Sequence, residues 1–189
     1  VLRHGTLSIG YTGLAECLII LIGTNHGETE EAQNLGLEIV SDLEEIATQL
    51  SEKYDLNFNI LATSNPKLEE KFLKKDQSKF GVILGVTDKE AYTNGNSLPT
   101  EYKGTMEEKA KIEGPYHKLT KGGNKFWAEM EAEEIEKTES LQKLTDLIEK
   151  YDIGYTSIQV KKWKCLQCGY ENTQKGLKNC PNCGRAFDR

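Results

Sequence analysis

The sequence lacks a hydrophobic run long enough to cross a membrane. Its longest apolar stretch is Leu18–Ile22, extended upstream by Leu14 and Ala15, whereas a membrane-spanning helix needs about 20 apolar residues. No basic segment precedes this stretch and no small-residue cleavage site follows it, so the pattern of a secretory signal peptide is missing. These absences predict a cytoplasmic protein that makes no use of a membrane.

Positive charge is also scarce. The 189 residues contain 24 Lys and Arg against 30 Asp and Glu, a formal net charge of −6. A protein that coats nucleic acid needs clustered basic residues for phosphate binding, and this balance argues against that class. Hydrophobic residues make up 37% and charged residues 29%, which is ordinary for a globular domain with a sizeable core. The chain opens at Val1 in the middle of a pattern, which predicts a piece of something longer.

Cysteines are few and unevenly placed. Cys17 stands alone among Leu14, Leu18 and Leu21 at helical spacing, where a buried cysteine acts as a small hydrophobe; a redox role is the less favoured alternative. The other four lie close together near the end of the sequence. Secreted disulfide frameworks spread their cysteines along the chain, so this layout favours a metal site in a reducing compartment.

Those four cysteines form two pairs with the same continuation, Cys-x-x-Cys-Gly. The two-residue gap lets both sulfurs of a pair reach one ion at about 2.3 Å, and a glycine at φ > 0 turns the backbone under the metal. Four sulfur ligands fit zinc, or a single iron ion. We favour structural zinc, with four metal-free thiols as the alternative, because four protein ligands leave no open position for catalysis. The predicted ligands are Cys165, Cys168, Cys180 and Cys183.

Hydrophobic periodicity predicts an α/β protein. Helices are expected at Leu14–Ile22 and from an N-cap at Thr29 to about Tyr54, followed by a strand around Leu56–Ala62 and a helix that starts near Pro66. Further along the chain, we expect strands in KFWAEMEA and IGYTSIQV and an amphipathic helix over 134–151 between them. The Gly- and Pro-containing stretches EAYTNGNSLPTEYKG and KIEGPYHKLTKGGNK are predicted to be loops.

Several blocks in the same order resemble the large catalytic subunit of the anaerobic, class III ribonucleotide reductases. They are GTLSIGYTGLAE, LNFNILATSNPKLEEKF, FGVILGVTDKEAYTNG and KIEGPYHKLTKGG, followed by the four-cysteine module. The resemblance implies a ten-stranded α/β barrel of the glycyl-radical type, of which residues 1–160 would be the C-terminal portion. Residues 161–189 would form a small zinc-ribbon module. The sequence departs from the family pattern at several points: ATSNPKL stands where ATPAEGL is usual, YTNGNSLP lacks the usual Ser and His, Asn25 stands where a second His is common, and SIQVKKWKC lacks the expected Asn-His-Pro.

The same resemblance implies a function in deoxyribonucleotide biosynthesis. The intact enzyme would reduce ribonucleoside triphosphates with a glycyl radical, installed by a radical-SAM iron–sulfur activase, and a finger-loop cysteine. Both radical residues are expected outside this chain, so no catalytic residue is assigned and the fragment alone is expected to be inactive. The intact protein is expected to be a homodimer. Two alternatives are another glycyl-radical enzyme and a non-catalytic zinc-ribbon adaptor that binds nucleic acid or protein.

The turn from strand to helix at 63–67 is the predicted substrate-binding site. Free N–H groups and the positive end of a helix dipole favour phosphate at such a turn, and the resemblance places the substrate's phosphates there. Hydroxyl donors and a positive charge would complete the site. The alternative is that Ser64 and Asn65 simply cap the helix. The predicted substrate-binding residues are Thr63, Ser64, Asn65 and Lys67.

Overall fold

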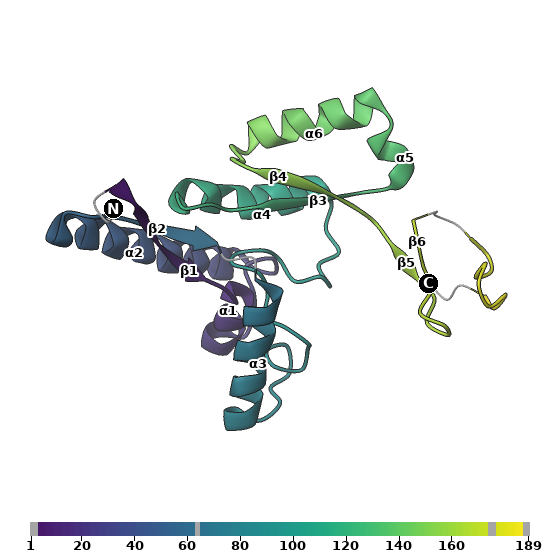
Figure 1. The fold of residues 1–189 in the computed structure, drawn as a ribbon, viewed down its shortest axis with the longest axis horizontal. Coiled ribbons are helices and arrows are strands. Elements are labelled where there is room, and N and C mark those ends of the chain that lie inside the picture. The colour runs from purple at the N-terminus through teal and green to yellow at the C-terminus, as the bar shows by residue number, and fades with distance from the viewer. Residues whose placement is uncertain (1–3, 63–64, 174–176, 187–189) are drawn as a thin grey trace.

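The computed structural model describes residues 4–62, 65–173 and 177–186. Its helices and strands alternate along the chain, and each strand that is paired lies in a two-stranded sheet. Figure 1 shows an α/β part with the cysteine-containing end at one side of it. In chain order the elements are β1 (Thr6–Tyr11), α1 (Leu14–Ile22), α2 (Glu30–Tyr54), β2 (Asn57–Ala62), α3 (Pro66–Phe80), α4 (Met106–Leu119), β3 (Phe126–Met130), α5 (Ala132–Ile135), α6 (Thr138–Lys150), β4 (Thr156–Val160), β5 (Trp163–Lys164) and β6 (Glu171–Asn172).

The first unit joins two parallel strands through two helices. β1 pairs with β2 from Thr6 opposite Asn57 to Tyr11 opposite Ala62, and parallel strands need such a crossover connection. The predicted bounds of α1 and α2 are confirmed, as is Thr29 as the N-cap, whose side chain accepts a hydrogen bond from the Ala32 N–H. Strand β2 is confirmed too, whereas β1 was not predicted.

A small apolar core holds this unit together. Side chains from α1, α2 and β2 meet there, and Tyr116 of α4 closes the cluster. Each fully buried Val, Leu or Ile side chain contributes roughly 1.5–3 kcal/mol to the stability of the fold relative to leaving it exposed. The buried members are Leu14, Leu18, Val40, Ala47, Ile60 and Tyr116. Cys17 is exposed, contrary to the prediction. It lies on the same face of α1 as Ile20 and Leu21, which are also exposed, whereas Leu14 and Leu18 lie on the face that packs into the core.

The second unit is again parallel, with β3 paired to β4 and helices α5 and α6 between them. The two predicted strands are confirmed. The predicted helix over 134–151 is divided into α5 and α6, because Lys137 takes an extended conformation between them. The core of this second unit is formed mainly by side chains of α4, β3 and α6. Its buried members are Ala110, Phe126, Ala128, Met130, Leu144 and Ile153.

Helix α4 corrects the prediction of a loop over 111–125. Its start is set by a capping box, in which Thr105 and Glu108 each accept a hydrogen bond from the other's backbone N–H. The helix then continues through Gly114 and Pro115, although both residue types usually interrupt a helix. Gly114 is required by packing, because a Cβ there would lie 2.7 Å from the Tyr151 carbonyl oxygen.

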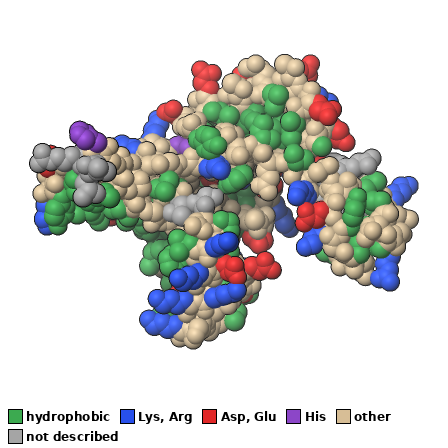
Figure 2. Space-filling view, in the orientation of Figure 1, with side chains coloured by type: hydrophobic (Ala, Val, Ile, Leu, Met, Phe, Trp, Pro, Cys, Tyr) green, Lys and Arg blue, Asp and Glu red, His purple; other side chains and the backbone are tan. Residues whose placement is uncertain are grey.

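The cysteine-containing end forms a lobe of its own. An extended segment leads from β4 into β5, and the short antiparallel pair β5–β6 begins the lobe. Figures 1 and 2 show this lobe standing apart from the α/β part. Among the described residues, no helix is both long and apolar enough to cross a membrane.

Candidate metal centre and substrate turn

The two cysteine pairs adopt the same backbone turn. In the first, the Gly169 N–H donates to the Cys165 carbonyl oxygen at 2.8 Å, and in the second the Gly184 N–H donates to that of Cys180, also at 2.8 Å. Both glycines have φ of +72°, a left-handed conformation that favours glycine. The repeated Cys-x-x-Cys-Gly pattern therefore encodes a repeated turn.

The two turns bring all four sulfurs together. The Sγ atoms of Cys165 and Cys183 lie 3.8 Å apart, and those of Cys168 and Cys180 lie 3.6 Å apart. All four lie within 4.8 Å of one another. Tetrahedral zinc with Zn–S bonds of about 2.3 Å requires sulfurs about 3.8 Å apart. The donor set and its spacing fit one metal ion with four sulfur ligands, as predicted.

Hydrogen-bond donors surround the outer sulfurs. The backbone N–H groups of Tyr170 and Arg185 donate to Cys168 and Cys183, respectively. The side chain of Asn182 also donates to Cys168, with 3.6 Å between Nδ2 and Sγ. Such donors stabilise a thiolate and hold it in the direction that the metal needs.

The predicted substrate turn lies where β2 ends and α3 begins. Thr63 and Ser64 fall outside the described residues. Asn65 is the N-cap of α3 and accepts a hydrogen bond from the Leu68 N–H at 3.2 Å, so its side chain takes the capping role that was considered as the alternative. Lys67 is exposed. Figure 2 shows lysine side chains gathered over α3, which makes the helix that follows the turn basic.

A loop over residues 92–96 closes the carboxyl ends of β1 and β2. The Gly13 N–H and the Thr12 hydroxyl both donate to the Thr93 carbonyl oxygen, at 2.8 and 2.7 Å. Gly95 has φ of +50°, and a Cβ there would lie 2.7 Å from that of Ala62. Only glycine permits this approach, which places the loop directly against the end of β2.

Glu16 of α1 binds the same loop, and this role was not predicted from the sequence. Its carboxylate is buried, with 2% of the residue exposed. It accepts hydrogen bonds from the backbone N–H and the hydroxyl of Thr93, at 3.1 and 2.6 Å, and from Lys89 at 2.7 Å. The sequence does contain a signal for this role: an acidic residue in an otherwise apolar helix needs a buried partner.

A second polar group joins β1, the loop and the residues after α4. The Asn96 side-chain oxygen accepts hydrogen bonds from the Tyr11 hydroxyl and from the Asn124 amide, both at 2.9 Å. His26 Nε2 lies 2.9 Å from the Asn96 carbonyl oxygen. The carbonyl oxygen can only accept, so Nε2–H is the donor, and burial lowers the pKa of His26, which favours the neutral ring.

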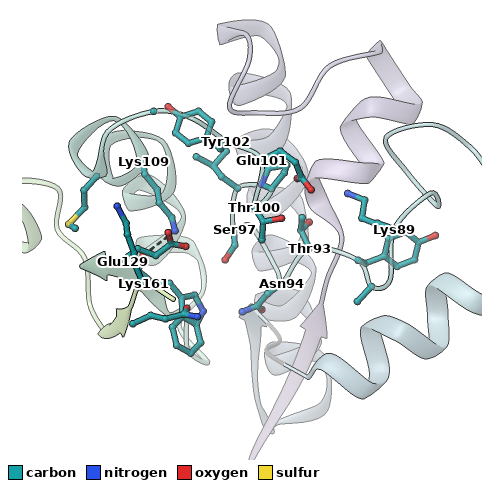
Figure 3. Close-up of a pocket in the computed structure, with 18 of the residues that line it drawn as sticks. Lys89, Thr93, Asn94, Ser97, Thr100, Glu101, Tyr102, Lys109, Glu129 and Lys161 are labelled. Atoms are coloured by element: carbon teal, nitrogen blue, oxygen red, sulfur yellow. Dashed lines mark hydrogen bonds between the residues drawn. The ribbon is translucent and has the colours of Figure 1, made fainter. Parts of the chain in front are cut away.

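A cleft of about 800 Å³ opens beside this polar group. The loop that follows Lys89 forms one wall, and the β3–β4 sheet with the start of α4 forms the other. Figure 3 shows Lys109, Glu129 and Lys161 on the sheet side, facing Thr93 and Ser97 of the loop. The Lys109 amine donates to the Trp127 carbonyl oxygen at 3.0 Å. A cleft of this size with mixed charge is large enough for a nucleotide.

Solved structures share this arrangement. An anaerobic ribonucleotide reductase aligns with 98% of the chain and 29% of its own chain, with a TM-score of 0.74 and 21% identity. The anaerobic ribonucleotide reductase from Thermotoga maritima with dATP bound in the specificity site also covers 98% of the chain, and 30% of its own, with a TM-score of 0.70 and 21% identity. The chain thus has the fold of part of an anaerobic ribonucleotide reductase, which confirms the predicted fold class.

Sequence comparison gives the family. The family model of the anaerobic ribonucleoside-triphosphate reductases matches residues 1–189, and the chain belongs to this family. The Escherichia coli (strain K12) anaerobic ribonucleoside-triphosphate reductase is 31% identical over 187 residues. That of Haemophilus influenzae is 32% identical over 188 residues. These alignments cover 96% of the chain and 26% of each relative, so the chain spans about a quarter of their length.

Proposed function

We propose that this chain is the C-terminal part of the catalytic subunit of an anaerobic ribonucleoside-triphosphate reductase. The observation that carries the proposal is that one family model spans both the α/β part and the four-cysteine cluster. The intact enzyme would replace the ribose 2′-OH of a ribonucleoside triphosphate with hydrogen. Its glycyl radical, on a residue outside this chain, would supply the one-electron oxidation of a finger-loop cysteine. A radical-SAM iron–sulfur activase and a second copy of the subunit are the proposed partners.

The metal in this proposal is zinc, and its role is structural. Four thiolates at nearly tetrahedral spacing support a closed site. In such a site the metal-binding energy is folding energy for the segment that carries the ligands. Zinc bound by Cys165, Cys168, Cys180 and Cys183 would therefore order this segment of the chain.

The substrate's triphosphate is proposed to bind at the turn over 63–67. The α3 N-terminus and Lys67 provide positive potential at this point, while the Glu69 carboxylate of the first turn accepts a hydrogen bond from the Asn65 N–H. Asn65 serves as the helix cap. The Thr63 and Ser64 hydroxyls and the Lys67 amine are therefore the proposed hydrogen-bond donors to the phosphates. The loop at Thr93 and the adjoining cleft would then receive the rest of the nucleotide.

A chimera tests the proposed function. Residues 1–189 would replace the aligned segment of the Escherichia coli relative, and deoxynucleotide formation and the glycyl-radical signal would be measured anaerobically with activase. A control chimera would carry the aligned Haemophilus influenzae segment. We expect both chimeras to form the radical and the product. A folded, zinc-containing chimera that is inactive while the control is active would contradict the proposal.

A further inference from the structure

The two cysteine turns have the same length and the same backbone turn, but the side chains at their third positions make different contacts. Gln167 occupies this position in the first turn and Asn182 in the second. The Gln167 side-chain oxygen accepts a hydrogen bond from Arg185 at 2.9 Å. Asn182 instead donates to a sulfur of the opposite turn, Cys168. Both contacts link one turn to the other, but only the Asn182 contact reaches a metal ligand.

This difference gives one sulfur an additional donor. Cys165 and Cys180 are buried, so solvent reaches the cluster at Cys168 and Cys183. Each of these two outer sulfurs receives a backbone N–H, and Cys168 receives the Asn182 amide as well. A hydrogen bond to a charged acceptor is stronger than one between neutral groups. The Asn182 amide therefore has its largest effect when Cys168 is a thiolate, as it must be to bind metal.

We propose that Asn182 is a positioning residue of the metal centre, which orients the Cys168 thiolate and slows its loss from zinc. The inference rests on the proposed zinc site. By holding the sulfur from the opposite turn, the Asn182 amide also resists separation of the two turns. Without this amide, the Cys168 sulfur, which is already exposed, would lose its contact with the opposite turn and would be the first to leave the metal.

Two isosteric substitutions at matched positions provide the test. Asn182→Asp replaces the donating amide nitrogen with an oxygen that cannot donate, and Gln167→Glu adds the same charge in the other turn while keeping the acceptor for Arg185. Zinc affinity of the 189-residue chain would be measured by competition with a chromogenic chelator. Loss of an outer partner of a metal ligand weakens metal binding by about 10–100-fold. We expect such a loss in Asn182→Asp and a change of less than about twofold in Gln167→Glu.

A second readout identifies which ligand is affected. Asn182→Ala and Gln167→Ala remove each side chain without adding charge. The zinc-loaded proteins would be treated with N-ethylmaleimide, and mass spectrometry would show which of the four zinc-binding cysteines is modified first, apart from Cys17, which is exposed and is not a ligand in any variant. We expect faster modification in Asn182→Ala, beginning at Cys168, and wild-type behaviour in Gln167→Ala.

Equal losses in the two isosteric variants, or first modification at a zinc-binding cysteine other than Cys168 in Asn182→Ala, would overturn the role of Asn182. These outcomes differ from failure of the zinc site itself. A wild-type chain that binds no zinc would overturn the proposed metal centre together with this inference. Substitution of cobalt for zinc provides a spectroscopic check, because a change in the Cys168–metal bond would shift the thiolate-to-cobalt absorption in Asn182→Asp and not in Gln167→Glu.

Discussion

The carboxylate of Glu113 accepts a hydrogen bond from the Leu98 backbone N–H at 2.8 Å, in the interior between α4 and the loop before it. Burial raises the pKa of Glu113 to about 7, above the ordinary 4.5 that it regains on unfolding. The folded protein therefore binds the proton more tightly than the unfolded chain, and stability falls as the pH rises from about 4.5 to 7. The full effect amounts to about 3 kcal/mol.

Glu113→Gln is expected to remove this pH dependence and to raise the free energy of unfolding at pH 8. The glutamine keeps an oxygen for the Leu98 N–H and has no charge to desolvate. Urea unfolding between pH 4.5 and 8 would measure the effect, with the exposed Glu107→Gln as the control. An unchanged decline of stability in Glu113→Gln would contradict the assignment.

His117, on the same helix, makes the stability change with pH in the opposite direction. Burial lowers its pKa to about 4, so the folded protein holds the ring neutral while the unfolded chain protonates it near its ordinary 6.5. Stability from this group is complete above about pH 6.5 and is lost as the pH falls toward 4. His117→Leu is expected to flatten the acid side of the stability profile, measured by urea unfolding. His4→Leu, at an exposed position, is the control for the loss of a histidine.

Local signals predicted much of the fold. Thr29 and Gly23 mark helix ends through capping and a left-handed turn, and both were readable from the sequence. The Gly114–Pro115 pair was misread because a local breaker signal was outweighed by tertiary packing against Tyr151. Strand β1 was not predicted, and its pairing partner β2 lies about 50 residues further along the chain.

The candidate site was only partly predictable. The cysteine ligands were found because a metal site depends on residue type and short spacing, both of which are local. The role of the loop at Thr93 was not found, because its contacts with Gly13, Glu16 and Ala62 join residues far apart in the sequence. Non-local hydrogen bonds of this kind leave no periodic signal.

Glu16→Ala is expected to destabilise the protein strongly. It removes the partner of the Lys89 amine and of both Thr93 donors, and breaking a buried ion pair costs about 3–5 kcal/mol. Glu70→Ala is the matched control, because it removes a glutamate that pairs with Lys74 at the surface, where a pair contributes about 0–1 kcal/mol. Urea unfolding would compare the two. Similar losses would show that the buried network does not stabilise the loop.

Cys180→Ser is expected to abolish zinc binding and unfold the module from about Lys164 onward, while the α/β part stays folded. The reason is that metal-binding energy is local folding energy. Elemental analysis should give about one zinc per wild-type chain, and proteolysis should cut the variant only within the module. Cys17→Ser is the control and should keep its zinc. Loss of the α/β part in Cys180→Ser would show that the two parts do not fold independently.

The turn at 63–67 can be divided into a structural and a binding half. Asn65→Ala removes the cap of α3 and should cost about 0.5–2 kcal/mol of stability. Ser64→Ala with Lys67→Ala should leave stability nearly unchanged and weaken nucleotide binding, because each hydrogen bond to a charged phosphate contributes about 1.5–3 kcal/mol. Both sets of substitutions would be placed in the chimeric reductase, with binding measured by calorimetry and stability by thermal unfolding. Lys79→Ala, at the far end of α3, is the control for a general loss of positive charge. If the double variant binds nucleotide as tightly as the parent, the turn is a helix cap and the phosphates bind elsewhere.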